Sequence, residues 1–287
     1  MRPETAERER RNRKRKELLK AVGLHAILLV CAAAMVVPFL WMISTSLKRP
    51  RDIYVWPPTL FPQEIFWSNY PDSWSAAPFG RFYLNSLFVA LSVTGGQLIT
   101  CTLAAYAFAR LKFRGRDALF LAFLGTMMIP FQVSMIGAFQ VIHWLGWTDS
   151  YYALIVPGLA SPFGVFLLRQ FFLTLPTELE DAARIDGASR LGVIRHVIVP
   201  LSTPALATLA VFTFMGVWND FLWPLVVLNS EELYTVQLGL AVFRDQRSTV
   251  WNLLMAGTVT ATMPILVVFF FAQRYFIRGI ALTGLKG

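Results

Sequence analysis

Long apolar runs alternate with short polar segments along the whole chain. Each run is close to the roughly 20 residues with which an α-helix crosses the hydrocarbon core of a bilayer. Runs of this length lie at about 21–43, 84–109, 118–140, 153–174, 204–228 and 253–273. The pattern therefore predicts an all-α membrane protein with six transmembrane helices.

The distribution of basic residues predicts how these helices are oriented. An even number of spans puts both termini on one side, together with the polar segments that follow the second and fourth runs. This side holds 20 of the 26 basic residues, and the other side holds six. Because basic residues are retained in the cytoplasm, the split predicts a multi-pass protein of the cytoplasmic (inner) membrane with both termini cytoplasmic.

The same pattern divides the chain into segments. Residues 1–20 form a basic cytoplasmic N-terminus, and 21–43 form a first transmembrane helix that is too long for the apolar core of a cleaved signal peptide. Residues 44–83 are rich in Pro, Trp and Tyr and form an extracytoplasmic segment that suits a membrane interface. A core with five helices spans 84–273, and 274–287 form a short cytoplasmic C-terminal tail.

One polar segment, 175–200, is predicted to be ordered. Thr177 and Glu180 have the spacing of a capping box, in which a hydroxyl and a carboxylate satisfy the first free amides of a helix. Glu180 and Arg184 have the i,i+4 spacing of a favourable ion pair. Gly187 suits the left-handed position just past a helix end. We expect a two-turn helix and a glycine turn, then a second helical piece that ends before Pro200.

The residues alone leave two interpretations of this segment open. The first helix is amphipathic, with one apolar face formed by Leu179, Ala182 and Ala183 and a polar face opposite. It suits an ordered docking element for a partner protein. It also suits a helix that simply lies on the membrane surface.

Composition excludes several classes of function. Hydrophobic residues make up 56% of the chain and charged residues 15%, unlike an ordinary soluble domain. The net charge of +9 follows membrane topology and does not indicate a nucleic-acid surface. The two cysteines and the three separated histidines offer neither a disulfide framework nor metal-ligand spacing. A phosphate-binding loop is missing as well, so ATP, if it is used, binds another chain.

Two polar residues, Asn219 and Asp220, lie in the fifth apolar run. A carboxylate within a span usually faces a bundle interior or a water-filled cavity. At about 1.5 Å per residue, Asp220 would lie about 24 Å along the helix from Pro204, toward the external side. One interpretation places Asn219 and Asp220 at a translocation pathway or gate. The other is a structural contact near the outer interface.

The segment 178–200 resembles the EAA loop of ABC importer permeases. That pattern is Glu-Ala-Ala, three residues, Gly, nine residues, Ile, one residue and Leu-Pro. Here Asp181–Ala183 stands three residues before Gly187, and Val197–Pro200 completes the spacing, with Asp181 in place of the usual Glu. Further stretches are similar to carbohydrate-type permeases, especially the MalG-like subunits: Asn85–Leu87, Ala104–Arg110, Lys112–Gly115, Met128–Pro130, Phe166–Phe172, Ile185–Ser189, Trp218–Asn219 and the tail Gly279–Gly287.

The resemblance implies the type I ABC importer permease fold with a cytoplasmic coupling helix. It implies a permease subunit that translocates a mono- or oligosaccharide, together with a second, MalF-like permease. A MalK-like ATPase dimer would bind ATP and Mg and would also contact the tail, and an extracytoplasmic solute-binding protein would deliver the substrate. This chain would then be no enzyme and would hold no cofactor or metal. The residues implied to couple it to the ATPases are Glu178, Leu179, Asp181, Ala182, Ala183, Arg184, Asp186 and Gly187.

Three alternatives remain. A permease of the same superfamily would carry a non-sugar solute such as glycerol phosphate or a polyamine. A membrane-embedded enzyme would need clustered His, Asp or Ser in the spans, which the sequence lacks. A self-contained secondary transporter would be expected to show an internal repeat, and none is visible in the sequence.

Overall fold

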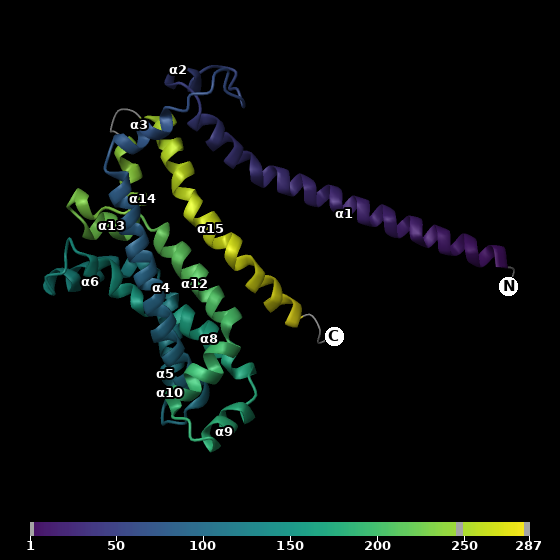
Figure 1. Ribbon diagram of the computed structural model, residues 1–287, viewed down its shortest axis with the longest axis vertical. Coiled ribbons are helices and arrows are strands. Elements are labelled where there is room, and N and C mark those ends of the chain that lie inside the picture. Colours follow the sequence, from purple (N-terminus) through teal and green to yellow (C-terminus); the bar gives the residue numbers. More distant parts are fainter. Residues whose placement is uncertain (1–2, 245–248, 284–287) are drawn as a thin grey trace. The chain divides into compact units, whose positions relative to one another are not determined.

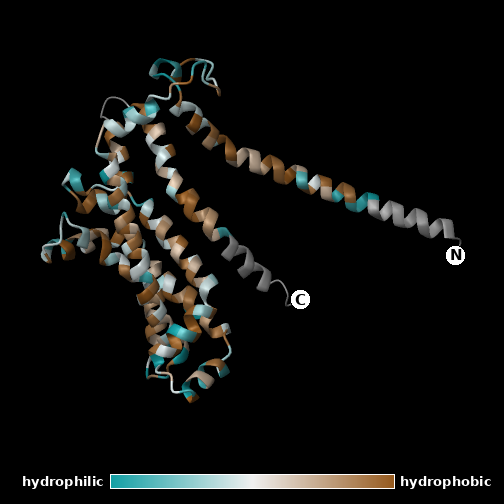
Figure 2. Ribbon diagram, viewed as in Figure 1, coloured by the Kyte–Doolittle hydropathy of each residue, from teal (hydrophilic) through white to brown (hydrophobic). Residues whose placement is uncertain are grey.

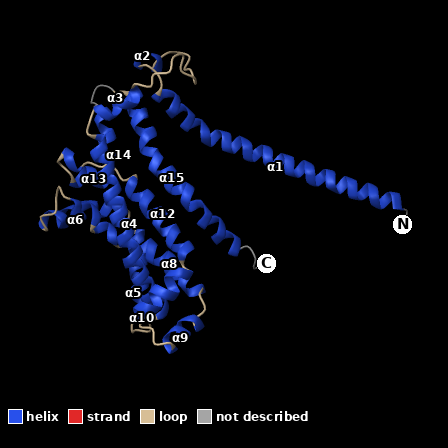
Figure 3. Cartoon of the chain, in the orientation of Figure 1, coloured by secondary structure: helices blue, strands red, loops and turns tan. Residues whose placement is uncertain are grey.

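The computed structural model describes residues 3–244 and 249–283, and the regular elements drawn for these residues are all helices (Figure 3). Within this part of the chain, four helices are long and apolar enough to cross a membrane: Arg15–Ser46, Phe79–Arg110, Tyr151–Thr174 and Trp251–Gln273. Two bent pairs of helices meet the same criteria together, which gives up to six spans if each pair counts as one. The all-α membrane fold predicted from the apolar runs is confirmed.

The chain divides into two compact units, of which the first comprises residues 1–73 and 248–259. It contains α1 (Pro3–Ser46) and α2 (Pro50–Ile53), and α3 (Asn69–Ser75) begins within it. The basic stretch and the first apolar run are thus one continuous helix. The apolar half of α1 is coloured brown in Figure 2, and its side chains are exposed, Leu29 and Val30 each by 70%. Such a surface suits contact with lipid or with another membrane helix.

Buried asparagines order the chain that follows α1. The Asn69 side-chain amide donates to the carbonyl oxygens of Ser46 (2.9 Å) and Lys48 (2.8 Å). Its own oxygen accepts from the amide of Asn252 at 2.8 Å. Since the last carbonyls of a helix have no partner within the helix, Asn69 supplies the donors that they need at the end of α1.

The second unit comprises residues 74–247 and 260–287. Its central helix, α4 (Phe79–Arg110), packs against α8 (Pro162–Thr174) and α12 (Thr203–Trp218) (Figure 1). Shorter helices surround these three: α5 (Arg116–Gly125), α6 (Phe131–Trp144), α7 (Tyr151–Ile155), α9 (Glu178–Ile185), α10 (Arg190–Val193), α11 (Val199–Leu201), α13 (Leu222–Val227) and α14 (Val236–Gly239). The last helix, α15, runs from Trp251 to Thr283. The tail from 274 was predicted to be a separate segment; the helix continues into it, and 284–287 lie outside the described residues.

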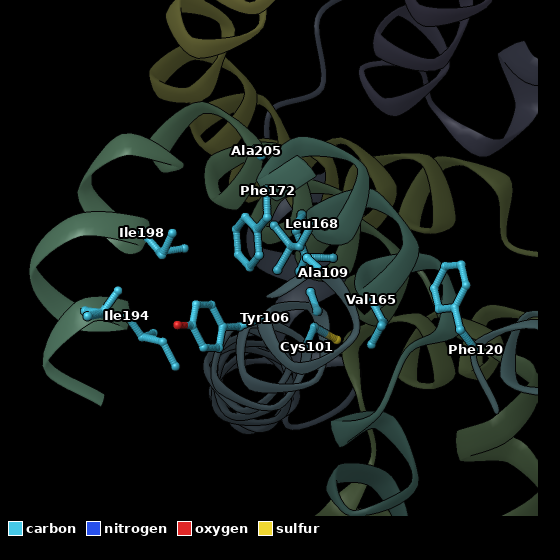
Figure 4. Close-up of a cluster of buried hydrophobic side chains, with 13 residues drawn as sticks. Cys101, Tyr106, Ala109, Phe120, Val165, Leu168, Phe172, Ile194, Ile198 and Ala205 are labelled. Atoms are coloured by element: carbon cyan, nitrogen blue, oxygen red, sulfur yellow. The ribbon is translucent and has the colours of Figure 1, made fainter. Parts of the chain in front are cut away.

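A buried apolar cluster joins α4, α8 and α12 (Figure 4). Close packing here depends on Gly164, because a Cβ at this position would lie 2.8 Å from Cys101 Sγ and 3.0 Å from Leu209 Cδ1. Interiors packed this tightly move as units and do not deform gradually. The cluster is formed by Cys101, Ala105, Tyr106, Ala109, Phe120, Val165, Leu168, Phe172, Val193, Ile194, Ile198, Ala205 and Leu209.

The third and fifth predicted spans are not single straight helices. Around Pro130, the helical stretch Arg116–Met128 and α6 meet at a bend of 103°. The residue before this proline, Ile129, has extended backbone (φ −89°, ψ 115°), as the proline ring requires. The fifth predicted span, 204–228, is interrupted as well, because α12 ends at Trp218 and α13 begins only at Leu222.

Candidate functional site

The segment 175–200 folds into α9, a left-handed turn and a second helical piece. At the end of α9, the Gly187 amide donates to Arg184 O (3.0 Å) and the Ala188 amide donates to Ala183 O (2.9 Å). This pair of bonds is a Schellman motif, in which the first residue past the helix cap has a left-handed backbone. Gly187 provides it with φ of +87°. The two-turn helix and the glycine turn predicted from the sequence are confirmed.

Glu180 points from α9 into the protein, and it is 4% exposed. One carboxylate oxygen forms an ion pair with Nε of Arg110 at 2.6 Å, although the two atoms are not aligned as a hydrogen bond. The other oxygen accepts a hydrogen bond of 3.1 Å from the Tyr106 hydroxyl. Arg110 also donates to Leu175 O at 2.7 Å, on the chain just before α9. Two residues at the end of α4 therefore hold both the start and the middle of the segment.

This arrangement corrects two local predictions. The capping box is wrong, since the Thr177 side chain makes no capping bond and its backbone is already helical (φ −72°, ψ −24°). The ion pair between Glu180 and Arg184 is wrong too, because Glu180 pairs with Arg110. The physical reason is the same in both cases. A buried carboxylate needs a buried cation and donors, and Arg110 with Tyr106 meets that need better than partners on the surface of α9.

Most residues predicted to couple with a partner lie on the exposed side of α9. Exposed positions on this segment include large apolar side chains, Leu179 at 44% and Ile185 at 86%. Ala183 was predicted to share the docking face with Leu179 and Ala182, but it packs on the apolar cluster of the chain's own core. The other predicted positions that are exposed are Glu178, Asp181, Ala182, Arg184, Asp186 and Gly187.

The second helical piece does not end before Pro200, as the sequence predicted. It continues from α10 through a five-residue π-helical turn, Ile194–Ile198, into α11, which contains Pro200. A proline lacks the amide proton that an α-helix would use, and the wider π turn ahead of it accommodates that loss. Ile194 and Ile198 project from this piece toward Tyr106 and Phe172 (Figure 4). The second piece is thus packed onto the same core as α9.

A cavity of about 420 Å³ lies elsewhere in the second unit, between α4, α6, α7 and the break that follows α12. Its wall is mainly apolar and includes Val93, Phe131 and Trp223. Asp220 also lines it, as does the buried Thr235. The size lies within the range of small-ligand pockets, roughly 300–1,000 Å³.

The structure separates the two polar residues predicted at a pathway. Asp220 is not inside a helix: it lies between α12 and α13, and its carboxylate accepts from the Trp223 amide at 3.2 Å. The estimate of its depth along one continuous helix is therefore wrong. Asn219 is exposed and bonds to Met215 O and Gln237. Of the two, only Asp220 is among the described residues that line the cavity.

Sequence reasoning missed Arg110 and Tyr106. Arg110 was counted among the basic residues that orient the membrane helices, and Tyr106 was placed in an apolar run; both lie in the stretch Ala104–Arg110 that resembles carbohydrate-type permeases, but neither was given a role at α9. The available signal was the group of three acidic residues in the first turn of α9. One of them, Glu180, points into the protein and not toward the exposed side of the helix. Pairing it with a residue 70 positions earlier in the chain requires the fold.

The family described as binding-protein-dependent transport system inner membrane component matches residues 98–282. The chain is 36% identical over 244 residues to the arabinooligosaccharides transport system permease protein AraQ of Halalkalibacterium halodurans, which covers 85% of this chain and 86% of the relative. It is 36% identical over 265 residues to the sn-glycerol-3-phosphate transport system permease protein UgpE of Pectobacterium atrosepticum, covering 89% of this chain and 94% of that one.

A solved structure has a similar fold. It belongs to a bacterial ABC transporter involved in the import of the acidic polysaccharide alginate. The match has a TM-score of 0.81 and 24% sequence identity, and it covers 91% of this chain and 98% of the other.

Proposed function

Because the chain belongs to the family of binding-protein-dependent transport system inner membrane components, we propose that it is a permease subunit of an ATP-driven ABC importer that carries a mono- or oligosaccharide into the cell. One observation supports the coupling role most directly. An ordered polar helix, α9, is anchored to the end of the central helix α4 while its outer face stays exposed.

The proposed assembly contains several partners. A second, MalF-like permease and a MalK-like ATPase dimer complete the membrane complex, and an extracytoplasmic solute-binding protein delivers the solute. ATP and Mg bind to the ATPase subunits, and hydrolysis occurs there. The 20 basic residues on the side of the termini support cytoplasmic termini and a cytoplasmic α9, where the ATPases can reach it.

The coupling itself is a two-state change. Closure of the ATPase dimer must favour one state of the permease over the other, and it can do so only through contacts that differ between the states. The exposed residues Leu179, Asp181 and Ala182, with Arg184 and Asp186, form the proposed docking surface. Glu178 precedes them at the start of α9, and Ala183 supports this surface from within.

Chemistry of the cavity favours a sugar over an anionic solute. Asp220 brings a carboxylate to its wall. A phosphate group would meet a like charge there, whereas sugar hydroxyls can donate to a carboxylate. The 36% identity to a glycerol phosphate permease supports that solute as the second candidate. We propose that Asp220 lies on the solute pathway. Asn219, its neighbour in the sequence, does not line the cavity; we propose it as part of a gate outside the cavity wall.

Reconstitution tests the proposal. The chain is placed in proteoliposomes with its partner permease, the ATPase subunits and the binding protein, and uptake of a labelled arabinooligosaccharide is measured with ATP inside the vesicles. We expect uptake that requires hydrolysable ATP, the binding protein and this chain. Uptake that persists without ATP, or an assembled complex that transports neither sugars nor glycerol phosphate, would overturn the proposal.

A further inference from the structure

We propose that Glu180 is a positioning residue: its buried pair with Arg110 fixes α9 to the end of α4, so that a movement imposed on α9 is passed to the cavity wall. This inference rests on the proposed coupling function. It assigns to Glu180 a role inside the chain, distinct from the exposed docking surface of α9.

Because this ion pair is buried, it is stable in only one position of α9 relative to α4. The Glu180 side chain is 6% exposed and the Arg110 side chain 9%. A carboxylate and a guanidinium shielded from water in this way cannot separate without leaving a charge unsolvated. The Tyr106 hydroxyl donates a hydrogen bond to the second carboxylate oxygen of Glu180. The same hydroxyl interacts with Arg184, one turn further along α9. Sliding or rolling of α9 against α4 would break all of these contacts together.

Three further contacts attach α9 and its flanking residues to the end of α4 and the apolar cluster. Arg110 binds Leu175 O before α9 starts. Ala183 and Ala188, at the end of α9 and just past its turn, pack on the apolar cluster that contains Tyr106. The stretch 175–188 is thus attached before α9, within it and just after its turn, and each attachment involves the last turns of α4 or the cluster around them.

The central helix carries this attachment to the cavity. α4 is one helix of 32 residues without a break. At about 1.5 Å per residue, Val93 lies about 25 Å along it from Arg110. Val93 is part of the cavity wall. Between these two points, α4 packs closely on α8 and α12 at Gly164, so a displacement of its cytoplasmic end cannot be absorbed locally.

A second ion pair in the same unit provides a matched control. Arg81 and Glu232 form a pair at 3.3 Å, but their side chains are 52% and 75% exposed. It has the same chemistry as the Arg110–Glu180 pair without the burial. Neutralising Glu232 should therefore leave coupling unchanged, whereas neutralising Glu180 should not.

The test uses the complete importer in proteoliposomes, with Ala138→Cys on the cavity wall and Cys31→Ser to remove the exposed native thiol. The labelling rate of this cysteine by a maleimide is compared with and without ATP plus vanadate, which traps the ATPase dimer. ATP hydrolysis is measured on the same preparation. Variants are Glu180→Gln, which keeps the shape of the side chain but removes its charge and replaces one accepting oxygen by an NH2 donor, and Glu232→Gln as the control.

We expect ATP to change the labelling rate in the wild-type background and in Glu232→Gln. In Glu180→Gln, the complex should assemble and hydrolyse ATP while the ATP-dependent change in labelling is lost. Transport of an arabinooligosaccharide per ATP hydrolysed should fall at least about 5-fold, the lower range of measured coupling energies. A role in stability alone would lower the amount of complex but leave both ratios unchanged, and that result would overturn the proposal.

The reversed pair, Arg110→Glu with Glu180→Arg, keeps the test decisive if Glu180→Gln assembles poorly. Recovery of coupling above both single reversals supports a direct link, and a double variant no better than the worse single one contradicts it. The outcome for the proposed function is separate. If ATP fails to change the labelling rate in the wild-type background, the coupling function itself fails. If ATP changes the labelling rate in the wild-type background and changes it equally in Glu180→Gln, this inference fails and the coupling function stands.

Discussion

Substitution of Gly187 tests the link between the turn after α9 and transport. Its φ of +87° lies in the left-handed region, and its amide donates to Arg184 O at 3.0 Å. Apart from Gly187 and its two chain neighbours, none of the described residues has a heavy atom within 4 Å of a Cβ built at this position, so the surroundings leave room for a side chain. The expected penalty therefore comes from the backbone conformation alone.

The structure ranks three variants by that penalty. Asn tolerates the left-handed region and should be close to wild type. Ala should cost about 1–2 kcal/mol, which shifts the equilibrium toward an unformed turn roughly 5–30-fold. Pro fixes φ near −65° and has no amide proton for Arg184 O, so its cost should be about 3 kcal/mol or more.

ATP-driven uptake and ATP hydrolysis, measured in the same proteoliposomes, check this ranking. We expect transport per ATP to decrease in the order Asn, Ala, Pro, while the amount of chain in the membrane stays constant. Normal uptake by Gly187→Pro would refute the reasoning. So would an Asn variant as impaired as the Pro variant, because the two differ in the conformation that they allow.

Three other predictions concern separate parts of the chain. Asp220→Asn should alter the rate or the apparent affinity of uptake, and unchanged kinetics would favour a purely structural role at the start of α13. The purified chain alone should hydrolyse no ATP, and measurable turnover that co-purifies with it through size exclusion would contradict the assignment. Asp149 accepts bonds from the Ser230 hydroxyl and from the backbone amides of Ser230 and Asn229, which holds the pKa of its carboxyl below the usual range. A lowered pKa in the folded state stabilises the protein above the unfolded value, about pH 4, and this contribution is lost as pH falls through the folded pKa. Asp149→Asn should therefore make the protein less stable at neutral pH and should remove this part of its acid sensitivity, as followed by limited proteolysis between pH 7 and pH 3; an unchanged acid profile would contradict the contact.

The apolar runs predicted the helical membrane fold because hydrophobic length is a property of local sequence. Breaks inside those runs were harder to place. Pro130 was visible, but a proline in a membrane helix can be accommodated, and only the extended backbone of Ile129 shows that the chain turns there. The gap between α12 and α13 has no proline at its start. Pro224, however, stands four residues after Asp220 and has no amide proton for the carbonyl of residue 220, as a continuous helix would require. The Asp220 carboxylate accepts the amide of Trp223 instead.

At the candidate site, local reasoning succeeded where the interaction is local. Gly187 was placed correctly because a helix end and its left-handed residue are adjacent in sequence. Glu180 was assigned to Thr177 and Arg184 because these are its sequence neighbours. Its actual partners come from α4, and burial, which the sequence does not reveal, decides between the two sets.

The central claim is that the outer face of α9 docks on an ATPase subunit. A cysteine at Ile185, 86% exposed on that face, tests it directly in the assembled importer, with Cys31→Ser in the background. A photoactivatable maleimide on Ile185→Cys should cross-link to the ATPase subunit, and the same reagent on Phe61→Cys, 79% exposed in the predicted extracytoplasmic segment, should not. An assembled, transporting complex that gives no ATPase cross-link from Ile185→Cys, or equal cross-links from both positions, would contradict the account.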